Sequence, residues 1–253
     1  MSKLCIVFLC NKIYFNKFIY TCQQLITVGN YKGEICLVIG NDLLNDSLLD
    51  NNLIRNNNIL IKHFPDIKFD NEFLKIQYNL NRPKIWYNKL FQYHKLYLFD
   101  TYFKKWDYIF YIDCGITILS DIQPILNSKK SNILLAHSDA YPKYEWKLYD
   151  QFDNNLNTYF SKLNNNYKLN IDYFQTTIML YDTNIINENI FNDLYNLTIN
   201  YPISKTNDQG IIALYFTNVK QLWEQIMIRN IDTYFYDYSK RNINDKYIMV
   251  KSI

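Results

Sequence analysis

The feature that most constrains the fold of this sequence is the stretch 106–119, WDYIFYIDCGITIL. Residues 108–112 form an aromatic and β-branched run, which is typical of a strand buried on both faces. Asp113 follows directly, and Cys114 and Gly115 are small enough to let a ligand approach closely. Open α/β sheets bind ligands at the carboxyl ends of their strands, so Asp113 is a candidate site residue. The alternative is an aspartate that only ends the strand in a turn.

Strand and helix patterns alternate along the chain. Apolar runs predict strands at 4–9, 34–39, 59–61, 108–112, 132–136, 173–181 and 247–250. Apolar residues at helical spacing predict helices at 14–28, 86–102 and 185–199, and one starting at Asp208 that Ser204 or Thr206 would cap. Strand, helix and strand with short joints is the pattern of a parallel sheet. With no internal repeat and no linker, we expect a single α/β domain over residues 1–253, with a mostly parallel central sheet flanked by helices.

Composition excludes several classes of protein. The net charge of +3 is too small to indicate nucleic-acid binding. No apolar run approaches the roughly 20 residues that span a membrane, and residues 1–10 read as a first strand and not as a signal peptide. Five cysteines without paired spacing indicate reduced thiols, so we expect a cytoplasmic protein. The excess of Asn, Ile, Lys and Tyr follows AT-rich codons and hints at an AT-rich genome, that of a large DNA virus or of a parasite. A viral origin would place the protein in host cytoplasm or virion.

Three polar motifs are candidates for chemistry. The first is Asp113-x-Gly115 after its buried strand, and the second is Gln175-Thr176-Thr177 inside a later strand. A buried glutamine in a strand is uncommon, because its amide needs partners once water is removed. The third is Asp208-Gln209-Gly210 at a helix start, where an aspartate alone is ordinary capping. Their order along the chain is more informative than any one of them.

In that order the motifs resemble those of the GT-A glycosyltransferases, most closely the glycogenin-like family of nucleotide-sugar transferases. That family has a Lys-Leu pair in a helix, Asp-x-Asp after a buried strand, an Ala-x-x-Asp loop, an Asn-x-Gly strand and Asp-Gln-Gly at a helix start. The similar segments here are His94-Lys95-Leu96 and residues 111–115, 135–139, 173–177 and 207–212. The resemblance covers about residues 4–220 and implies a single-domain GT-A, Rossmann-like fold.

The resemblance implies a donor site for a nucleotide sugar. Asn11, after the first strand, would contact the base. Lys95 would lie near the donor sugar or phosphates, and we prefer it to Lys89 because of its spacing to Asp113. Asp113 would touch the ribose and help to hold the diphosphate.

The resemblance also implies which residues meet the sugar. Asp208 and Gln209 would bind the donor sugar and face its anomeric carbon, so they are the candidate catalytic residues. Gln175 would hold sugar hydroxyls in place of the family's asparagine.

The metal is the main departure from the family. Its two Asp-x-Asp carboxylates hold Mn²⁺ or Mg²⁺ against the diphosphate, whereas Gly115 stands at the second position here. The family's late His-x-x-Gly-x-x-Lys-Pro-Trp segment is also missing. Two alternatives stay open. A divalent cation could bind Asp113 with help from another carboxylate such as Asp139 or Asp237, or Lys251 or Arg241 could supply the positive charge.

The expected function is transfer of a sugar from a nucleotide-diphosphate donor, UDP-linked, to a glycan or protein hydroxyl, with retention of the anomeric configuration. The alternative is a degenerate transferase that binds nucleotide or glycan without turnover, which Gly115 motivates. A nucleotidyltransferase on a related sheet would need a basic glycine-rich loop near Asn11, and the sequence has none. The expected partners are the donor and the acceptor, with no nucleic acid.

Overall fold

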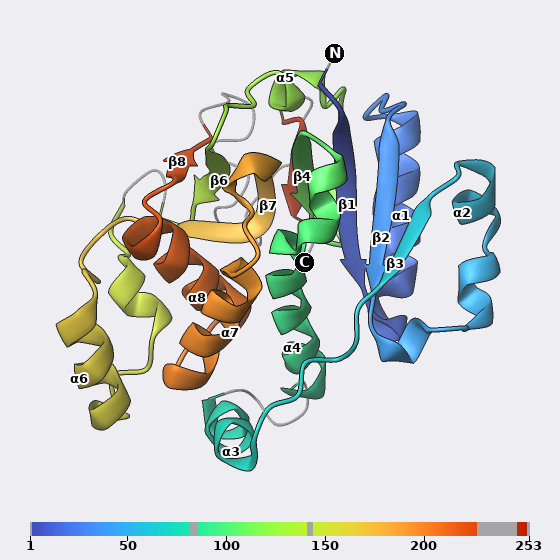
Figure 1. Ribbon diagram of the computed structural model, residues 1–253. Coiled ribbons are helices and arrows are strands. Elements are labelled where there is room, and N and C mark those ends of the chain that lie inside the picture. Colours follow the sequence, from blue (N-terminus) through green and yellow to red (C-terminus); the bar gives the residue numbers. More distant parts are fainter. Residues whose placement is uncertain (1, 81–85, 141–143, 227–246, 252–253) are drawn as a thin grey trace.

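A seven-stranded sheet in the order β3-β2-β1-β4-β7-β6-β8 runs through the middle of the molecule (Figure 1). The computed structural model describes residues 2–80, 86–140, 144–226 and 247–251. The strands of this sheet are β1 (Leu4–Cys10), β2 (Glu34–Ile39), β3 (Leu60–His63), β4 (Tyr108–Ile112), β6 (Leu134–Ser138), β7 (Phe174–Asp182) and β8 (Trp223–Gln225). A separate antiparallel pair consists of β5 (Ile116–Ile118) and β9 (Met249–Lys251).

The sheet is mostly parallel, as the sequence predicts. β3, β2, β1 and β4 pair in parallel, and β6 pairs with β8 in parallel. The exception is β7, which runs antiparallel to both β4 and β6. Every residue of β7 is buried, which explains why its pattern is a continuous apolar and small-polar run without alternation. The seven strand predictions correspond to β1, β2, β3, β4, β6, β7 and β9, with shifts of a few residues at their ends, whereas the sequence patterns do not predict β5 and β8.

Helices cover both faces of the sheet (Figure 1). They are α1 (Phe15–Thr27), α2 (Asn52–Asn56), α3 (Asn71–Leu80), α4 (Trp86–Phe91), α5 (Gln123–Leu126), α6 (Asn157–Asn166), α7 (Ile190–Asn200) and α8 (Asp208–Leu214). Successive residues of β1 alternate between two cores, because neighbouring strand residues point to opposite faces. Ile6 and Phe8 pack with Phe18 of α1, whereas Val7 belongs to the core that contains Leu194 of α7.

Two local predictions are wrong. The single helix expected over 86–102 is a short α4 followed by two 3-10 helices, Gln92–Phe99 and Thr101–Lys105. Six of the eight residues of Gln92–Phe99 are buried, so tertiary packing on several sides overrides the helical period of the sequence. Neither Ser204 nor Thr206 caps α8: the residue before it is Asn207, with a φ of 54° and no side-chain capping bond.

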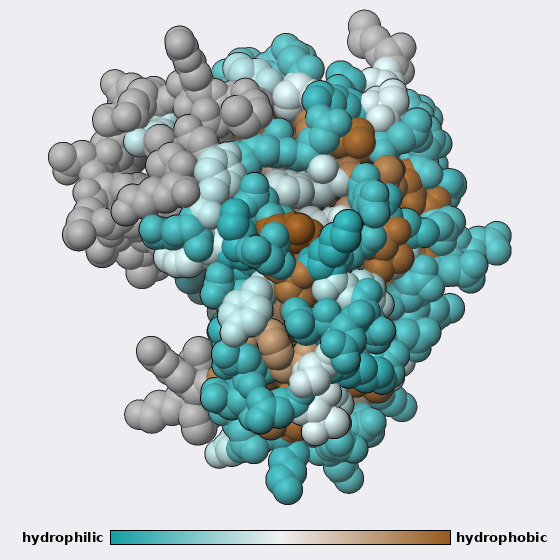
Figure 2. All heavy atoms as spheres, turned by 90° about the vertical axis from the view of Figure 1, so that its left-hand side faces the viewer, coloured by the Kyte–Doolittle hydropathy of each residue, from teal (hydrophilic) through white to brown (hydrophobic). Residues whose placement is uncertain are grey.

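The face seen in Figure 2 is mainly hydrophilic, with hydrophobic side chains in several separate places. Within the described part of the chain, no helix combines the length and apolar character needed to cross a membrane. Open α/β sheets bind ligands at the edge where their strands end, and the polar groups that could do chemistry lie at this edge.

Candidate active site

The site lies at the edge of the sheet where β1, β4 and β6 end. Asn11, Asp113 and Asp139 each come within one residue of the end of one of these strands. β7 is antiparallel to its neighbours, so its beginning lies at the same edge, and the backbone N–H of Asp113 donates to the carbonyl of Thr177 at 2.8 Å. Helix α8 contributes Asp208 from its first turn. The antiparallel direction of β7 thus brings the Gln175-Thr176-Thr177 motif beside Asp113.

A buried ion-pair cluster is the centre of this edge. Lys95 Nζ lies 3.1 Å from Asp113 Oδ1 and 3.3 Å from Asp208 Oδ2. It also donates to the hydroxyl of Thr176 at 3.2 Å, and that hydroxyl donates to Asp208 Oδ2 at 2.8 Å. The hydroxyl of Tyr111 donates to Asp113 Oδ1. Lys95 and Asp208 are almost fully buried, whereas the Asp113 side chain is 24% exposed. Asp113 is therefore the most exposed of the three charged side chains in the cluster.

Burial and charge pairing act against each other on these groups. Burial alone would lower the pKa of Lys95, but the carboxylates of Asp113 and Asp208 outweigh it and the pKa is raised. Burial raises the pKa of Asp208, and Lys95 and Thr176 offset only part of that rise. Burial and the neighbouring Asp113 raise the pKa of Tyr111, so its hydroxyl stays protonated and remains a donor. Lys95 is accordingly a fixed positive charge beside the partly exposed carboxylate.

A second polar network surrounds Asp139. Its carboxylate accepts hydrogen bonds from Tyr173 at 2.7 Å, from Gln209 at 3.2 Å and from the amide of Gln175. Gln151 links the network to α8, because its Oε1 accepts from Gln209 at 3.0 Å and its Nε2 donates to Tyr173 at 2.8 Å. These bonds satisfy buried polar groups that would otherwise be unpaired, and they hold the side chain of Gln209 at the start of α8.

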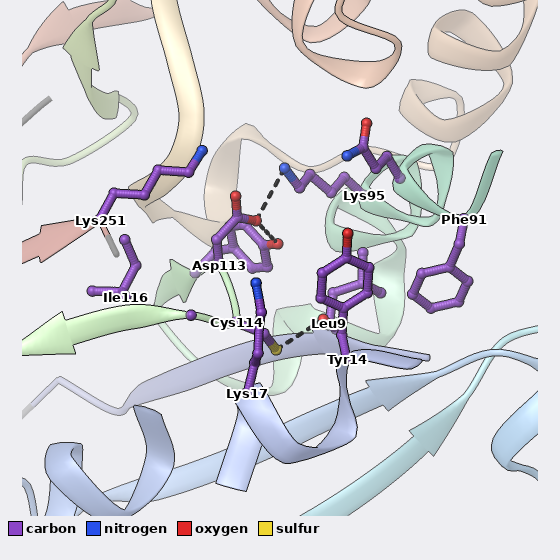
Figure 3. A pocket seen from close by; sticks show the side chains of 12 residues that line it. Leu9, Tyr14, Lys17, Phe91, Lys95, Asp113, Cys114, Ile116 and Lys251 are labelled. Carbon is purple, nitrogen blue, oxygen red and sulfur yellow. Dashed lines mark hydrogen bonds and ion pairs between the residues drawn. The ribbon is translucent and has the colours of Figure 1, made fainter. Parts of the chain in front are cut away.

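A cavity of about 210 Å³ opens beside the ion-pair cluster (Figure 3). We call it the Asp113 cavity. It is lined by Leu9, Tyr14, Lys17, Phe91, Gln92, Lys95, Tyr111, Asp113, Cys114, Gly115, Ile116 and Lys251. Its charged lining residues, among those the structure describes, are three lysines and one aspartate. Such a lining attracts an anionic group.

A second cavity of about 270 Å³ lies next to the first, with Phe91 lining both. We call it the Asn11 cavity, because Asn11 lines it together with Asp42, Asp66, Ile67, Leu90 and His94. The Asn11 side chain accepts from the backbone N–H of Tyr14 at 3.2 Å and so orders the turn after β1. His94 Nε2 lies 3.4 Å from Asp66 Oδ1.

The burial of His94 predicts a stability loss in acid. Burial lowers the pKa of His94 from 6.5 to about 4, which Asp66 offsets only in part. The unfolded chain therefore binds a proton that the folded chain does not between these values. The free energy of unfolding should therefore fall by about 3 kcal/mol as the pH is lowered from 6.5 to 4. Denaturant unfolding from pH 7 to pH 4 should show that His94→Gln makes the free energy of unfolding depend less on pH.

His63, which is only half-buried, is the matched control for this prediction. The His63→Gln protein is expected to keep the wild-type dependence on pH. If the free energy of unfolding of His94→Gln fell as steeply between pH 7 and pH 4 as that of the wild type, the acid sensitivity could not be assigned to His94.

The structure brings most of the predicted site residues together. Asp113, Lys95 and Asp208 share the ion-pair cluster, while Gln175 and Gln209 share the Asp139 network. Gly115 and Lys251 line the Asp113 cavity, and Asn11 lines the neighbouring one.

Of two other expected cations, one lies near the cluster and one is not described. The carbonyl of Lys89 accepts from the side chain of Asn207 at 3.0 Å, and burial lowers the pKa of the Lys89 ammonium group, which the nearby Asp208 offsets in part. The ion pair with Asp113 is made by Lys95. Arg241 lies outside the described residues, as does Asp237.

Sequence reasoning missed several residues of the site. Tyr111 is two residues before Asp113 on the same strand, and this i, i+2 spacing could have indicated a shared face. Thr176 was visible inside the Gln175-Thr176-Thr177 motif, where a hydroxyl in a buried run needs a partner. Tyr173 and Gln151 carry no comparable signal, because only the fold brings them to Asp139.

No protein-family model matches the sequence, and no curated protein sequence matches it either. Solved structures do resemble the fold. The galactosyltransferase LgtC, in complex with donor and acceptor sugar analogs, superposes with a TM-score of 0.60 at 12% identity, covering 98% of this chain and 86% of its own. The glycosyltransferase GlyE of Streptococcus pneumoniae gives 0.55 at 13% identity, covering 89% of this chain and 45% of its own.

The mannosyltransferase Ktr4p of S. cerevisiae also gives a TM-score of 0.55 at 13% identity, over 88% of this chain and 68% of its own. The chain thus spans less than half of GlyE and most of LgtC. At these identities the similarity shows the fold alone, and the fold is that of the GT-A glycosyltransferases.

Proposed function

We propose that this protein transfers a sugar from a nucleotide-diphosphate donor, a UDP-sugar, to a hydroxyl group of a glycan or protein, with retention of the anomeric configuration. The observation that carries the proposal is the buried cluster of Lys95, Asp113 and Asp208 beside a lysine-lined cavity, at the ligand-binding edge of a GT-A sheet. The similarity of this fold to glycosyltransferases of different sugar specificity supports sugar transfer in general.

Each part of the site has a role in this proposal. The Asn11 cavity takes the base, and the adjoining Asp113 cavity takes the diphosphate. Asp208 and Gln209, held at the start of α8, face the donor sugar, and Gln175 contributes to the same polar network. The fixed charges act where negative charge develops on the departing diphosphate, which is the largest electrostatic demand of the reaction.

The test is incubation with a panel of nucleotide sugars, measuring release of free nucleotide and, by thermal shift, donor binding. We expect one UDP-sugar to raise the melting temperature and to be consumed. No binding and no release with any donor would refute the proposal.

A second candidate function is a transferase that binds nucleotide or glycan without turnover. It is favoured by one observation: Gly115 offers no second carboxylate, and the single Asp113 already pairs with Lys95 at 3.1 Å. Binding of a donor without any hydrolysis or transfer would favour this alternative.

A further inference from the structure

Gly115 lies beside the side chain of Lys17. Its φ of +95° belongs to the left-handed region that favours glycine. A Cβ at this position would lie 3.3 Å from Cδ of Lys17 and 4.0 Å from its Nζ. The space into which a side chain at 115 would project is therefore already filled by the lysine of α1.

A resident divalent cation does not fit this site. Mn²⁺ and Mg²⁺ need several oxygen ligands, usually from more than one carboxylate. Asp113 Oδ1 already accepts from Lys95 and Tyr111, and Gly115 has no side chain. Among the described residues, no three His, Cys, Asp or Glu side chains are grouped as a metal site would require. The ammonium groups of the cavity would also repel a cation.

The same three ammonium groups suit a diphosphate. Figure 3 shows the side chains of Lys17, Lys95 and Lys251 extending into the cavity around Asp113. They come from three separate elements: α1, the 3-10 helix Gln92–Phe99 and β9. Lys95 is engaged by two carboxylates, whereas Lys17 is exposed and its Nζ lies 5.5 Å from the centroid of the Tyr14 ring. Lys17 is therefore the lysine placed to gain a phosphate partner.

We infer that Lys17, together with Lys251, holds the donor diphosphate and that sugar transfer needs no divalent cation. This inference rests on the proposed transferase function. In the reaction, the bond between the anomeric carbon and the phosphate oxygen breaks, and its electron pair stays on the departing nucleoside diphosphate. The acceptor oxygen forms the new bond to that carbon, and its proton passes to the diphosphate. Lys17 neutralises the charge that develops next to Gly115.

The binding test compares UDP with uridine, using calorimetry in excess EDTA. Lys17→Ala should weaken UDP binding by about 10- to 100-fold, the range expected for one charge-assisted contact, and leave uridine binding unchanged. Lys17→Arg should restore most of the UDP affinity, because it keeps the charge. Lys75→Ala is the matched control, since Lys75 is another exposed lysine on a helix and lies away from both cavities.

The activity test measures nucleotide release by the wild type in excess EDTA and again with added Mn²⁺. Equal rates are expected, with Lys17→Ala slowed and Lys75→Ala unchanged. Activity that EDTA abolishes and Mn²⁺ restores, or UDP affinity in Lys17→Ala equal to that of Lys75→Ala, would overturn the inference while leaving the transferase function intact. Failure of the wild type to bind or use any donor would instead refute the proposed function.

Discussion

Replacing Lys95 by methionine is expected to destabilise the protein by about 3–5 kcal/mol, because it leaves two carboxylates in a buried site without their shared positive partner. Asp208 Oδ2 lies 3.3 Å from Lys95 Nζ with a side chain only 3% exposed. The melting temperature should fall by about 2–4 °C for each kcal/mol in a chain of this size. Calorimetry or thermal unfolding by circular dichroism measures the effect.

The chain supplies a matched control for this substitution. Lys147 pairs with Asp172 at 2.7 Å, but the two side chains are 33% and 44% exposed. Solvent screens that pair, so Lys147→Met should lower stability by about 1 kcal/mol or less. Neutralising a carboxylate in the double variant Lys95→Met/Asp208→Asn should recover part of the loss. Equal destabilisation by Lys95→Met and Lys147→Met would show that the buried cluster contributes no more than a surface ion pair.

The pH dependence of that loss has a definite sign. Burial already raises the pKa of Asp208, and removing Lys95 raises it further. A carboxyl whose pKa is raised in the folded state destabilises that state increasingly as the pH rises from the pKa of the unfolded chain to the raised pKa, and has no such effect below both values. The stability difference between the wild type and Lys95→Met should therefore shrink as the pH is lowered.

The central sheet could be predicted from the sequence because its strands are continuous apolar runs. Residues 109–112 are buried in the interior of the sheet and belong alternately to the cores on its two faces, so each of these positions selects an apolar or aromatic side chain. The position of Asp113 at the end of β4 follows from that run alone. The pairing of Asp113 with Lys95 does not, because it depends on how residues 92–99 pack.

The direction of β7 and the place of Lys17 could not be predicted. An apolar run has the same pattern in either direction, so the pattern alone could not assign Gln175 and Thr176 to the site edge. That position follows from β7 being antiparallel to β4. Lys17 has the pattern of an ordinary exposed helix residue. Only the positive φ of Gly115 and its closeness to Lys17 show that the lysine lies where a second carboxylate was expected.

Replacing Asp208 by asparagine is expected to lower kcat by at least about 100-fold while changing the affinity for UDP by less than about threefold. Asparagine keeps the size of the side chain and an oxygen for the hydroxyl of Thr176, which lies 2.8 Å from Oδ2. It removes the negative charge that balances Lys95 at the start of α8, where we place the donor sugar. Steady-state nucleotide release and UDP calorimetry separate the two effects.

Asp172→Asn is the control for charge removal, because Asp172 pairs with Lys147 outside both cavities. It should leave kcat and UDP affinity as in the wild type. A kcat in Asp208→Asn within threefold of the wild type would remove Asp208 from the catalytic residues, even if the protein is a transferase. If the wild type binds UDP and releases no sugar, Asp208 instead serves only to hold Lys95, and Asp208→Asn should change stability without any change in nucleotide binding.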